Sequence, residues 1–480
     1  MSMSSSEGGA APVMNEAMLQ ALREIVGDDG LLIGEAVRER YAGYFMSSIE
    51  ASALVRPSNT DQVSRVLALC NAQRQPVVVQ GGMSGWVRAT ETHPGDLALS
   101  LERLDRIEQV DPVNRTATVQ AGVVLQTLQE HLEPFQLSFP LDLGGRGSCH
   151  IGGNAATNAG GMRVIRYGMM REQVLGVEAV LADGTVVSSL NRMIKNNTGY
   201  DLKQLFIGSE GTLGVITRLV LRLREQPRSN NTALVAAQSF EQLVELLRHC
   251  DAALGGLLSA FELVDNRFYN VNTGPSRHVA PLPQTYPFYA IIEALGSDQE
   301  RDTELFESVL GEAGEKGLYA DAVVATSERQ RADIWAVRED LQHIVRDFQP
   351  FYAFDVSLPV GEMSDYMVRV RTLLQQKWKD GAIAFLGHVG DGNLHIAIGA
   401  GGAQDREAVE SCVYEPLMPF FGSVSAEHGI GLEKRAYLGI SRSAVEIELM
   451  LRIKDLMDPV GILNPGKIFG SREAPSRRAA

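Results

Sequence analysis

The chain has 480 residues, a formal net charge of −15 at pH 7 and 45% hydrophobic residues. This length exceeds that of one ordinary domain, so we expect two or three soluble globular domains. The acidic balance excludes nucleic acid and anionic membranes as partners, because neither is attracted to an acidic surface. An anionic substrate must therefore be bound by cations gathered locally at its site.

The cysteines and the N-terminus indicate the cellular compartment of the protein. Cys70, Cys149, Cys250 and Cys412 form no C-x-x-C pair, which is typical of unpaired thiols in a reducing environment. Residues 1–12 contain neither a basic segment nor an apolar stretch, and no run of eighteen apolar residues occurs anywhere. The sequence therefore predicts a cytoplasmic protein with a disordered leader and no membrane span.

Two helices and a strand are expected at the start of the chain. The first helix covers residues 15–26. A second is opened by the capping-box spacing of Ser58 and Asp61 and is stopped at Pro76. The apolar residues 77–80 then predict a buried strand.

Three segments rich in glycine follow in the N-terminal half, at residues 80–86, 144–161 and 207–216. The first continues directly from a strand and exposes successive backbone N–H groups, which can hold a pyrophosphate. Glycine pairs after strands are also common as plain turns, so this segment alone leaves both interpretations open. The second and third can press backbone against a large, planar, polar ligand. None has the G-x-G-x-x-G pattern that opens a helix after a strand, which disfavours a nicotinamide cofactor bound in that way.

Other patterns complete this half and the C-terminus. Hairpins are expected to turn at residues 111–114 and 183–184, with a helix at 124–133 between them. Residues 461–468 have the glycine and lysine spacing of a phosphate-binding loop. Ile468 replaces its magnesium-binding hydroxyl residue and Pro465 removes a backbone donor, so we exclude ATP.

A shift in composition at residues 224–231 marks a domain boundary. The elements beyond it predict an α+β domain with an antiparallel sheet and helices on one face. Strands are expected at residues 233–237, 288–293 and 354–358, and helices at 240–254, 303–313 and 361–376.

A hairpin with two histidines is the strongest chemical signal. The apolar runs 382–386 and 394–398 flank turn residues, which predicts a hairpin in which His388 faces His395. Directly opposed residues share a face with Cβ atoms about 5 Å apart, close enough to hold one metal ion. Glu427 would complete a three-ligand site with one open position. The alternative is that these histidines only form hydrogen bonds within a core or turn.

Two further residues are candidates for acid–base chemistry and substrate binding. His428 follows Glu427 but points elsewhere, so it is free to act as a base. Arg338 is a candidate carboxylate clamp because guanidinium offers a bidentate fork. An exposed helix contact with Glu339 or Gln342 explains Arg338 equally well.

The glycine-rich and histidine-containing motifs also resemble a known family. The chain is similar to the FAD-linked oxidases of the vanillyl-alcohol oxidase type, and within them to the D-2-hydroxyglutarate and D-lactate dehydrogenase branch. The resemblance spans residues 46–470 and is carried by the segments 147–161, 197–202, 208–214, 387–395, 426–429 and 463–467.

The resemblance implies the fold and the domains. A leader and helix would occupy residues 1–45, and an FAD-binding domain of two α+β subdomains residues 46–225. An α+β substrate-binding domain with an antiparallel sheet would cover residues 226–425. A C-terminal catalytic segment, 426–480, would return to the flavin.

It also implies the roles of individual residues. Zn²⁺ would be bound by His388, His395 and Glu427, with His428 as the base and Arg338 on the substrate carboxylate. Residues around FAD would be Gln80, Gly81, Gly82, Met83, Ser84, Gly85, Trp86, Gly147, Ser148, Gly152, Asn154, Thr157, Gly161, Gly211, Val215, Ile216 and Asn464.

The implied activity is oxidation of a D-2-hydroxy acid, first of all D-2-hydroxyglutarate to 2-oxoglutarate, with hydride transfer from C2 to flavin N5. Gln342, Ala353 and Ala397 stand where that branch has threonine, lysine and asparagine, so D-lactate dehydrogenase and glycolate oxidase subunit remain alternatives. A flavoprotein that only relays electrons, with a structural metal, is the alternative of another class.

The expected partners are a small 2-hydroxy acid and a separate electron acceptor. That acceptor would be an electron-transfer flavoprotein or a quinone-linked carrier, and a homodimer is possible.

Overall fold

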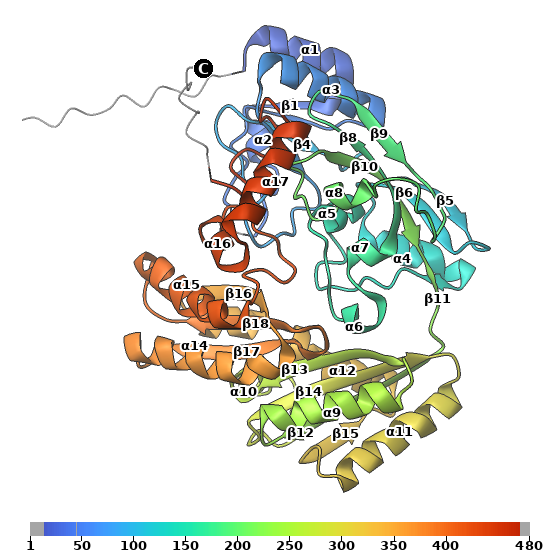
Figure 1. Ribbon diagram of the computed structural model, residues 1–480, viewed down its shortest axis with the longest axis vertical. Coiled ribbons are helices and arrows are strands. Elements are labelled where there is room, and N and C mark those ends of the chain that lie inside the picture. Colours follow the sequence, from blue (N-terminus) through green and yellow to red (C-terminus); the bar gives the residue numbers. More distant parts are fainter. Residues whose placement is uncertain (1–13, 45, 471–480) are drawn as a thin grey trace, which may run out of the picture.

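The computed structural model describes residues 14–44 and 46–470, so the leader predicted at residues 1–12 lies outside the described part. Helices and separate sheets form two halves that lie one above the other in Figure 1, joined by the chain that leaves β11 (Arg224–Glu225). This arrangement agrees with the predicted α+β class, which is confirmed.

A four-stranded sheet begins the upper half. Its order is β1 (Leu31–Ile33), β2 (Ala53–Val55), β4 (Leu97–Ser100) and β3 (Val77–Gln80). β4 runs parallel to both β2 and β3, whereas β1 is antiparallel to β2. The strand predicted at residues 77–80 is confirmed, and it delivers the chain into the first glycine-rich loop. The helices of this part are α1 (Glu16–Val26), α2 (Glu35–Arg38) and α3 (Thr60–Gln73).

The start of α3 differs from the prediction by one residue. Asn59, and not Ser58, is the N-cap, and its side chain accepts the N–H of Gln62 at 2.9 Å. The Gln62 side chain in turn accepts the N–H of Ser58. The predicted pair of Ser58 and Asp61 does not form; Asn59 caps the helix, and the return bond from the Gln62 side chain goes to the residue before this N-cap.

A five-stranded antiparallel sheet shares one apolar core with the first sheet. The predicted hairpins at residues 111–114 and 183–184 are confirmed as the turns of β5–β6 and β8–β9. The sheet order is β5 (Ile107–Asp111), β6 (Thr116–Gln120), β10 (Val215–Arg222), β8 (Val174–Val180) and β9 (Val186–Ser189). Its helices are α4 (Leu125–Leu132), α5 (Ile151–Ala156), α6 (Val164–Tyr167), α7 (Met170–Gln173) and α8 (Lys203–Phe206). The short strand β7 (Leu137–Ser138) pairs with β11.

The lower half is built on a seven-stranded antiparallel sheet. Its order is β15 (Asp321–Val324), β12 (Ser229–Ala237), β14 (Phe288–Gly296), β13 (Leu258–Asp265), β17 (Ala382–His388), β18 (Asn393–Gly399) and β16 (Phe351–Ser357). α9 (Phe240–Ala253), α11 (Gln299–Glu315), α14 (Met363–Lys377) and α15 (Arg406–Tyr414) contribute to one apolar cluster. α10 (Asn266–Asn272), α12 (Glu328–Glu339) and α13 (Gln342–Asp347) contribute to another.

The prediction that helices cover only one face of this sheet is therefore wrong. Along β12, Val235 joins one cluster while its neighbours Leu234 and Ala236 join the other. Successive side chains point to opposite faces, so a continuous apolar run indicates a strand that is buried on both faces. The run at residues 233–237 had this composition.

The C-terminal segment returns to the upper half. It contains α16 (Leu438–Ser441) and α17 (Ala444–Met457), and then Leu463 pairs with Val77 beside β3. The side chain of Asn464 accepts the N–H of Val79 at 2.8 Å and donates to the carbonyl of Glu210 at 2.6 Å. Within the described ranges, no helix has both the length and the apolar character needed to cross a membrane.

Candidate active site

The histidine hairpin forms as predicted, but with a different register. Leu386, and not His388, lies opposite His395, because Val389–Asp391 form a tight 3-10 turn that Gly392 closes at φ 82°. The partner of each residue is shifted by two positions. An even shift keeps both side chains on the same face of the sheet. The two histidines therefore still meet, with their Nε2 atoms 3.3 Å apart.

Glu427 joins these two histidines. Its Oε1 atom lies 3.5 Å from Nε2 of His388, and the three ligand atoms all lie within 4.8 Å of one another. Two donors bound tetrahedrally at about 2.0–2.1 Å from zinc are themselves about 3.3–3.4 Å apart. The spacing and the N, N, O donor set thus fit a divalent cation such as zinc.

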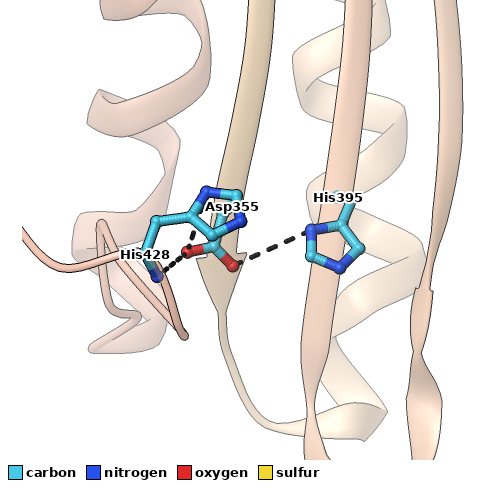
Figure 2. A group of neighbouring side chains, drawn as sticks. All are labelled: Asp355, His395 and His428. Atoms are coloured by element: carbon cyan, nitrogen blue, oxygen red, sulfur yellow. Dashed lines mark hydrogen bonds and ion pairs between the residues drawn. The ribbon is translucent and has the colours of Figure 1, made fainter. Parts of the chain in front are cut away.

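Asp355 offers a second possible group with His395 and His428, shown in Figure 2. Its Oδ2 atom already accepts the backbone N–H groups of Ala426, Glu427 and His428 at 3.0–3.2 Å. Its other oxygen, Oδ1, is buried without a hydrogen-bond partner and lies 3.8 Å from Nδ1 of His395, so Asp355 stands behind a proposed ligand while Oδ2 holds the backbone. We therefore assign Asp355 to holding the loop that carries Glu427 and His428.

Lys434 supports the same assignment. Its ammonium group is buried, donates to the carbonyl of Asp355 at 3.0 Å and lies 3.5 Å from Oδ2. Burial alone raises the pKa of the Asp355 carboxyl, but His428, Lys434 and His395 outweigh it, and that pKa lies well below its usual range. Burial lowers the pKa of Lys434, and the neighbouring carboxylate opposes that shift.

Glu262, which the sequence analysis did not single out, connects two predicted site residues. It lies on β13 with 0% exposure. Oε1 lies 2.5 Å from Nδ1 of His388, and Oε2 accepts from Nε of Arg338 at 2.9 Å. Burial alone would raise the pKa of Glu262. His388 and Arg338 outweigh this effect, so the pKa lies below its ordinary value and the carboxylate is charged.

Arg338 is thus paired with Glu262 on β13, and neither Glu339 nor Gln342 accepts a hydrogen bond from it. It lies in the last turn of α12 with a side chain that is 11% exposed. Among the described residues, none accepts a hydrogen bond from its Nη1 or Nη2 atoms. The two outer nitrogens are left for a ligand.

The first two glycine-rich segments lie against each other. A Cβ atom on Gly82 would stand 2.0 Å from the carbonyl oxygen of Ser148, so only glycine permits this approach. Met83 lies in the left-handed region at φ 57°. No atom lies within 4 Å of a Cβ built on Gly85 or Gly153. The backbone on that side borders open space, which fits a cofactor held by main-chain groups.

Several predicted cofactor residues have side chains that are enclosed by protein. Val215 and Ile216 are buried in the core of the upper half. The side-chain amide of Gln80 donates to the carbonyl of Thr90, and that of Asn154 donates to Sγ of Cys149. These four residues can reach a cofactor only through their backbone or by supporting the loops.

The remaining predicted cofactor residues lie in or beside the loops. Ser84 contacts Gly145, Gly147 lies next to Gln126, and Gly152 packs on Ala121. The Thr157 hydroxyl donates to the carbonyl of Gly153. Gly211 lies against the Asn464 amide, and a Cβ atom built on Gly81 would have Gly153 and His150 as its nearest neighbours, at 3.8 Å.

The cofactor loops and the metal-type group form one site. Gly161, at φ +110°, donates its N–H to Oε1 of Glu427 at 2.9 Å. Trp86 stacks on His428 with ring centroids 5.8 Å apart, and His428 stacks on His395 at 6.0 Å. A cavity of about 200 Å³ opens beside His428 and Trp86.

Two family descriptions match the chain. "FAD binding domain" matches residues 51–189, and "FAD linked oxidases, C-terminal domain" matches residues 226–468. Together with the relatives below, these matches show that the chain belongs to the FAD-linked oxidases. The predicted FAD cofactor is confirmed.

The relatives narrow the class. The chain is 40% identical to "D-2-hydroxyglutarate dehydrogenase, mitochondrial" of Danio rerio, over 88% of this chain and 80% of the relative. It is 37% identical to "D-2-hydroxyglutarate dehydrogenase" of Xanthomonas citri pv. viticola, over 88% and 90%. The prediction of an FAD-dependent hydroxy acid dehydrogenase is confirmed at this level.

Solved structures share the fold. Alkyldihydroxyacetonephosphate synthase has a TM-score of 0.75 at 17% identity, covering 95% of this chain and 85% of that one. p-Cresol methylhydroxylase has a TM-score of 0.74 at 15% identity, covering 95% and 96%. These similarities confirm the vanillyl-alcohol oxidase type of fold.

The predicted cytoplasmic location is wrong. The relatives from Danio rerio, Rattus norvegicus and Bos taurus are all named mitochondrial. The prediction rested on the absence of an apolar stretch at the N-terminus. Such a stretch is a feature of secretory signals. Mitochondrial transit peptides are amphipathic and rich in arginine, so that absence did not address them.

Proposed function

We propose that the protein oxidises a D-2-hydroxy acid with the help of a divalent cation, zinc by donor type, held by His388, His395 and Glu427. D-2-hydroxyglutarate is the first candidate substrate, because relatives up to 40% identical carry that name. The observation that carries the proposal is the bond from Gly161 to Glu427. It joins the cofactor loop directly to the group of converging donors.

Each residue of the site has a separate role in the proposed reaction. A cation held by His388, His395 and Glu427 would supply the Lewis acid for the 2-hydroxyl group, and bound FAD would supply the acceptor for the hydride of C2. The free Nη atoms of Arg338 pair with the substrate carboxylate and orient it. His428, held by its backbone N–H on Asp355, takes the hydroxyl proton. Trp86 covers the His428 ring and limits the access of water.

A second candidate is a 2-hydroxy acid without a second carboxylate, such as D-lactate or the achiral glycolate. Ala353 and Ala397 pair across β16 and β18, two residues along from the Asp355 and His395 pair and on the same face. The cations lining the cavity, Arg88, Arg406 and Lys434, each have a carboxylate partner. Within the described residues, the cavity offers no unpaired cation for a distal carboxylate.

The experiment is anaerobic titration of the purified flavoprotein with single 2-hydroxy acids, followed by loss of flavin absorbance. We expect D-isomers to reduce the flavin and L-isomers to leave it oxidised. Faster reduction by D-2-hydroxyglutarate supports the first candidate, and faster reduction by D-lactate or glycolate supports the second. A flavin that stays oxidised with all of them contradicts the proposal.

Chelation separates a catalytic cation from a structural one. Removing a catalytic cation abolishes flavin reduction while FAD stays bound and the melting temperature changes little. Removal of a structural cation would unfold the lower half instead, and the electron-relay alternative would then be favoured. We also propose a separate electron acceptor, an electron-transfer flavoprotein or a quinone-linked carrier, which the same preparation can be used to assay. A homodimer remains a prediction.

A further inference from the structure

Glu262 occupies a position that is costly for a carboxylate. It lies in β13, whose residues from Leu258 to Asp265 are all buried. A buried charge destabilises a protein unless it is paired and hydrogen-bonded. Each Glu262 oxygen has one partner, Nδ1 of His388 at 2.5 Å and Nε of Arg338 at 2.9 Å.

We infer that Glu262 is a positioning residue that fixes His388 and Arg338 together, and so couples the cation group to the substrate clamp. The inference rests on the proposed function, since it needs His388 as a ligand and Arg338 as the clamp. Glu262 itself touches neither substrate nor cofactor in this scheme.

The effect on His388 is to select one tautomer and one ring orientation. A proton on Nδ1 is donated to Glu262, which leaves the lone pair on Nε2. That atom faces Nε2 of His395 at 3.3 Å and Oε1 of Glu427 at 3.5 Å. A carboxylate behind a ligating histidine is worth about 10- to 100-fold in metal affinity.

The effect on Arg338 is to fix the plane of the guanidinium. Oε2 accepts from the inner nitrogen, Nε, and among the described residues none accepts from Nη1 or Nη2. A planar fork held at its base loses less conformational freedom when it pairs with a carboxylate. Losing Glu262 therefore weakens the binding of a cation and of a carboxylate together.

Glu293 provides a matched control on the adjacent strand β14. It is 1% exposed and is also paired with an arginine, Arg163, at 2.9 Å, and with the hydroxyl of Ser259 at 2.8 Å. It contacts none of the proposed ligands. Replacing it removes a buried charge in the same sheet without touching the site.

The test compares wild type, Glu262→Gln, Glu262→Asp and Glu293→Gln as FAD-loaded full-length proteins. Zinc affinity is measured by competition with a chromogenic chelator, and carboxylate binding by titrating oxalate against the oxidised flavin spectrum. We expect Glu262→Gln to weaken zinc by at least 10-fold and oxalate by at least 10-fold. Glu293→Gln should lower the melting temperature and leave both affinities within 2-fold of wild type.

Glu262→Asp keeps a negative charge beside Arg338, so it stays informative if the Gln variant fails to fold. The Asp side chain is one methylene shorter and cannot reach both His388 and Arg338. We expect at least one of the two affinities, for zinc or for oxalate, to fall at least 5-fold. If the Gln or the Asp variant binds zinc and oxalate as tightly as wild type, the inference about Glu262 is overturned while the proposed function stands. Wild-type protein that binds no zinc would instead overturn the proposed cation, and the coupling with it.

Discussion

Asp355 holds the Glu427 and His428 loop by accepting three backbone N–H groups, with the Lys434 ammonium beside it. Asp355→Asn leaves Lys434 buried without a counter-charge. We expect it to lower the free energy of unfolding by roughly 3–5 kcal/mol, measured by urea denaturation. The double variant Asp355→Asn with Lys434→Met should recover part of that loss. If the double variant is as unstable as the single one, the charge pair is not the cause.

His428 is the residue whose removal tests the proton transfer. We expect His428→Asn to slow anaerobic flavin reduction by about 10²- to 10⁴-fold, the usual contribution of a general base, while flavin content stays normal. His131→Asn, on the exposed side of α4, serves as the control and should reduce the flavin at the wild-type rate. Reduction of the His428→Asn variant at an unchanged rate would assign the base elsewhere.

The sequence motifs identified the residues in or near glycine-containing turns, and missed those that support them. His388 follows Gly387, and His395 and Glu427 lie within three residues of a glycine, which makes them visible as motifs. Glu262 and Asp355 are acids in the interior of apolar strands. That placement is itself a signal, because an isolated buried carboxylate requires a partner. The sequence could not name the partner, since strands far apart in the chain supply it.

At the level of elements, the N-cap of α10 predicts a pH dependence of stability. Asp265 accepts the N–H of Phe268, and burial raises its pKa to about 6, against the opposing effects of that bond and of Arg371. The folded state therefore holds an extra proton between about pH 4 and pH 6. The contribution of this proton to the free energy of unfolding is fully present below about pH 4. It is lost as the pH rises through about 6.

Asp265→Asn cannot ionise and still caps the helix. Relative to wild type, we expect its free energy of unfolding to improve by up to about 3 kcal/mol between pH 4 and pH 6.5, measured by urea denaturation. Asp298→Asn, at the exposed N-cap of α11, controls for the change of capping group. A constant difference between wild type and Asp265→Asn across this range would contradict the assignment.

Periodicity predicted which elements form, but not how they pair or pack. The strand at residues 77–80 and the hairpins were recognisable from local composition. The register of the histidine hairpin was not, because a 3-10 turn and a wider loop have the same turn residues. Burial of the large sheet on both faces had a local signal in the apolar run at residues 233–237, but which helices cover each face depends on contacts between distant segments.

At the scale of the molecule, Arg163 connects the two halves. From the start of α6 it bonds Asp142 in the upper half and Glu293 on β14, both at 2.9 Å. We expect Arg163→Met to lower the free energy of unfolding by roughly 3–5 kcal/mol, because the buried Glu293 loses its cation, whereas Asp142 keeps Arg146 at 2.8 Å. Arg329→Met removes an exposed contact at 4.0 Å, and calorimetry should find it close to wild type. Equal effects of the two variants would argue against this connection.

The pairing of Leu463 and Asn464 with β3 has a consequence for protein synthesis. The strand that leads into the first glycine-rich loop lacks these neighbours until residues 463 and 464 have left the ribosome. Flavin capture should therefore wait for these residues, and ribosome-stalled chains truncated before residue 463 should emerge colourless.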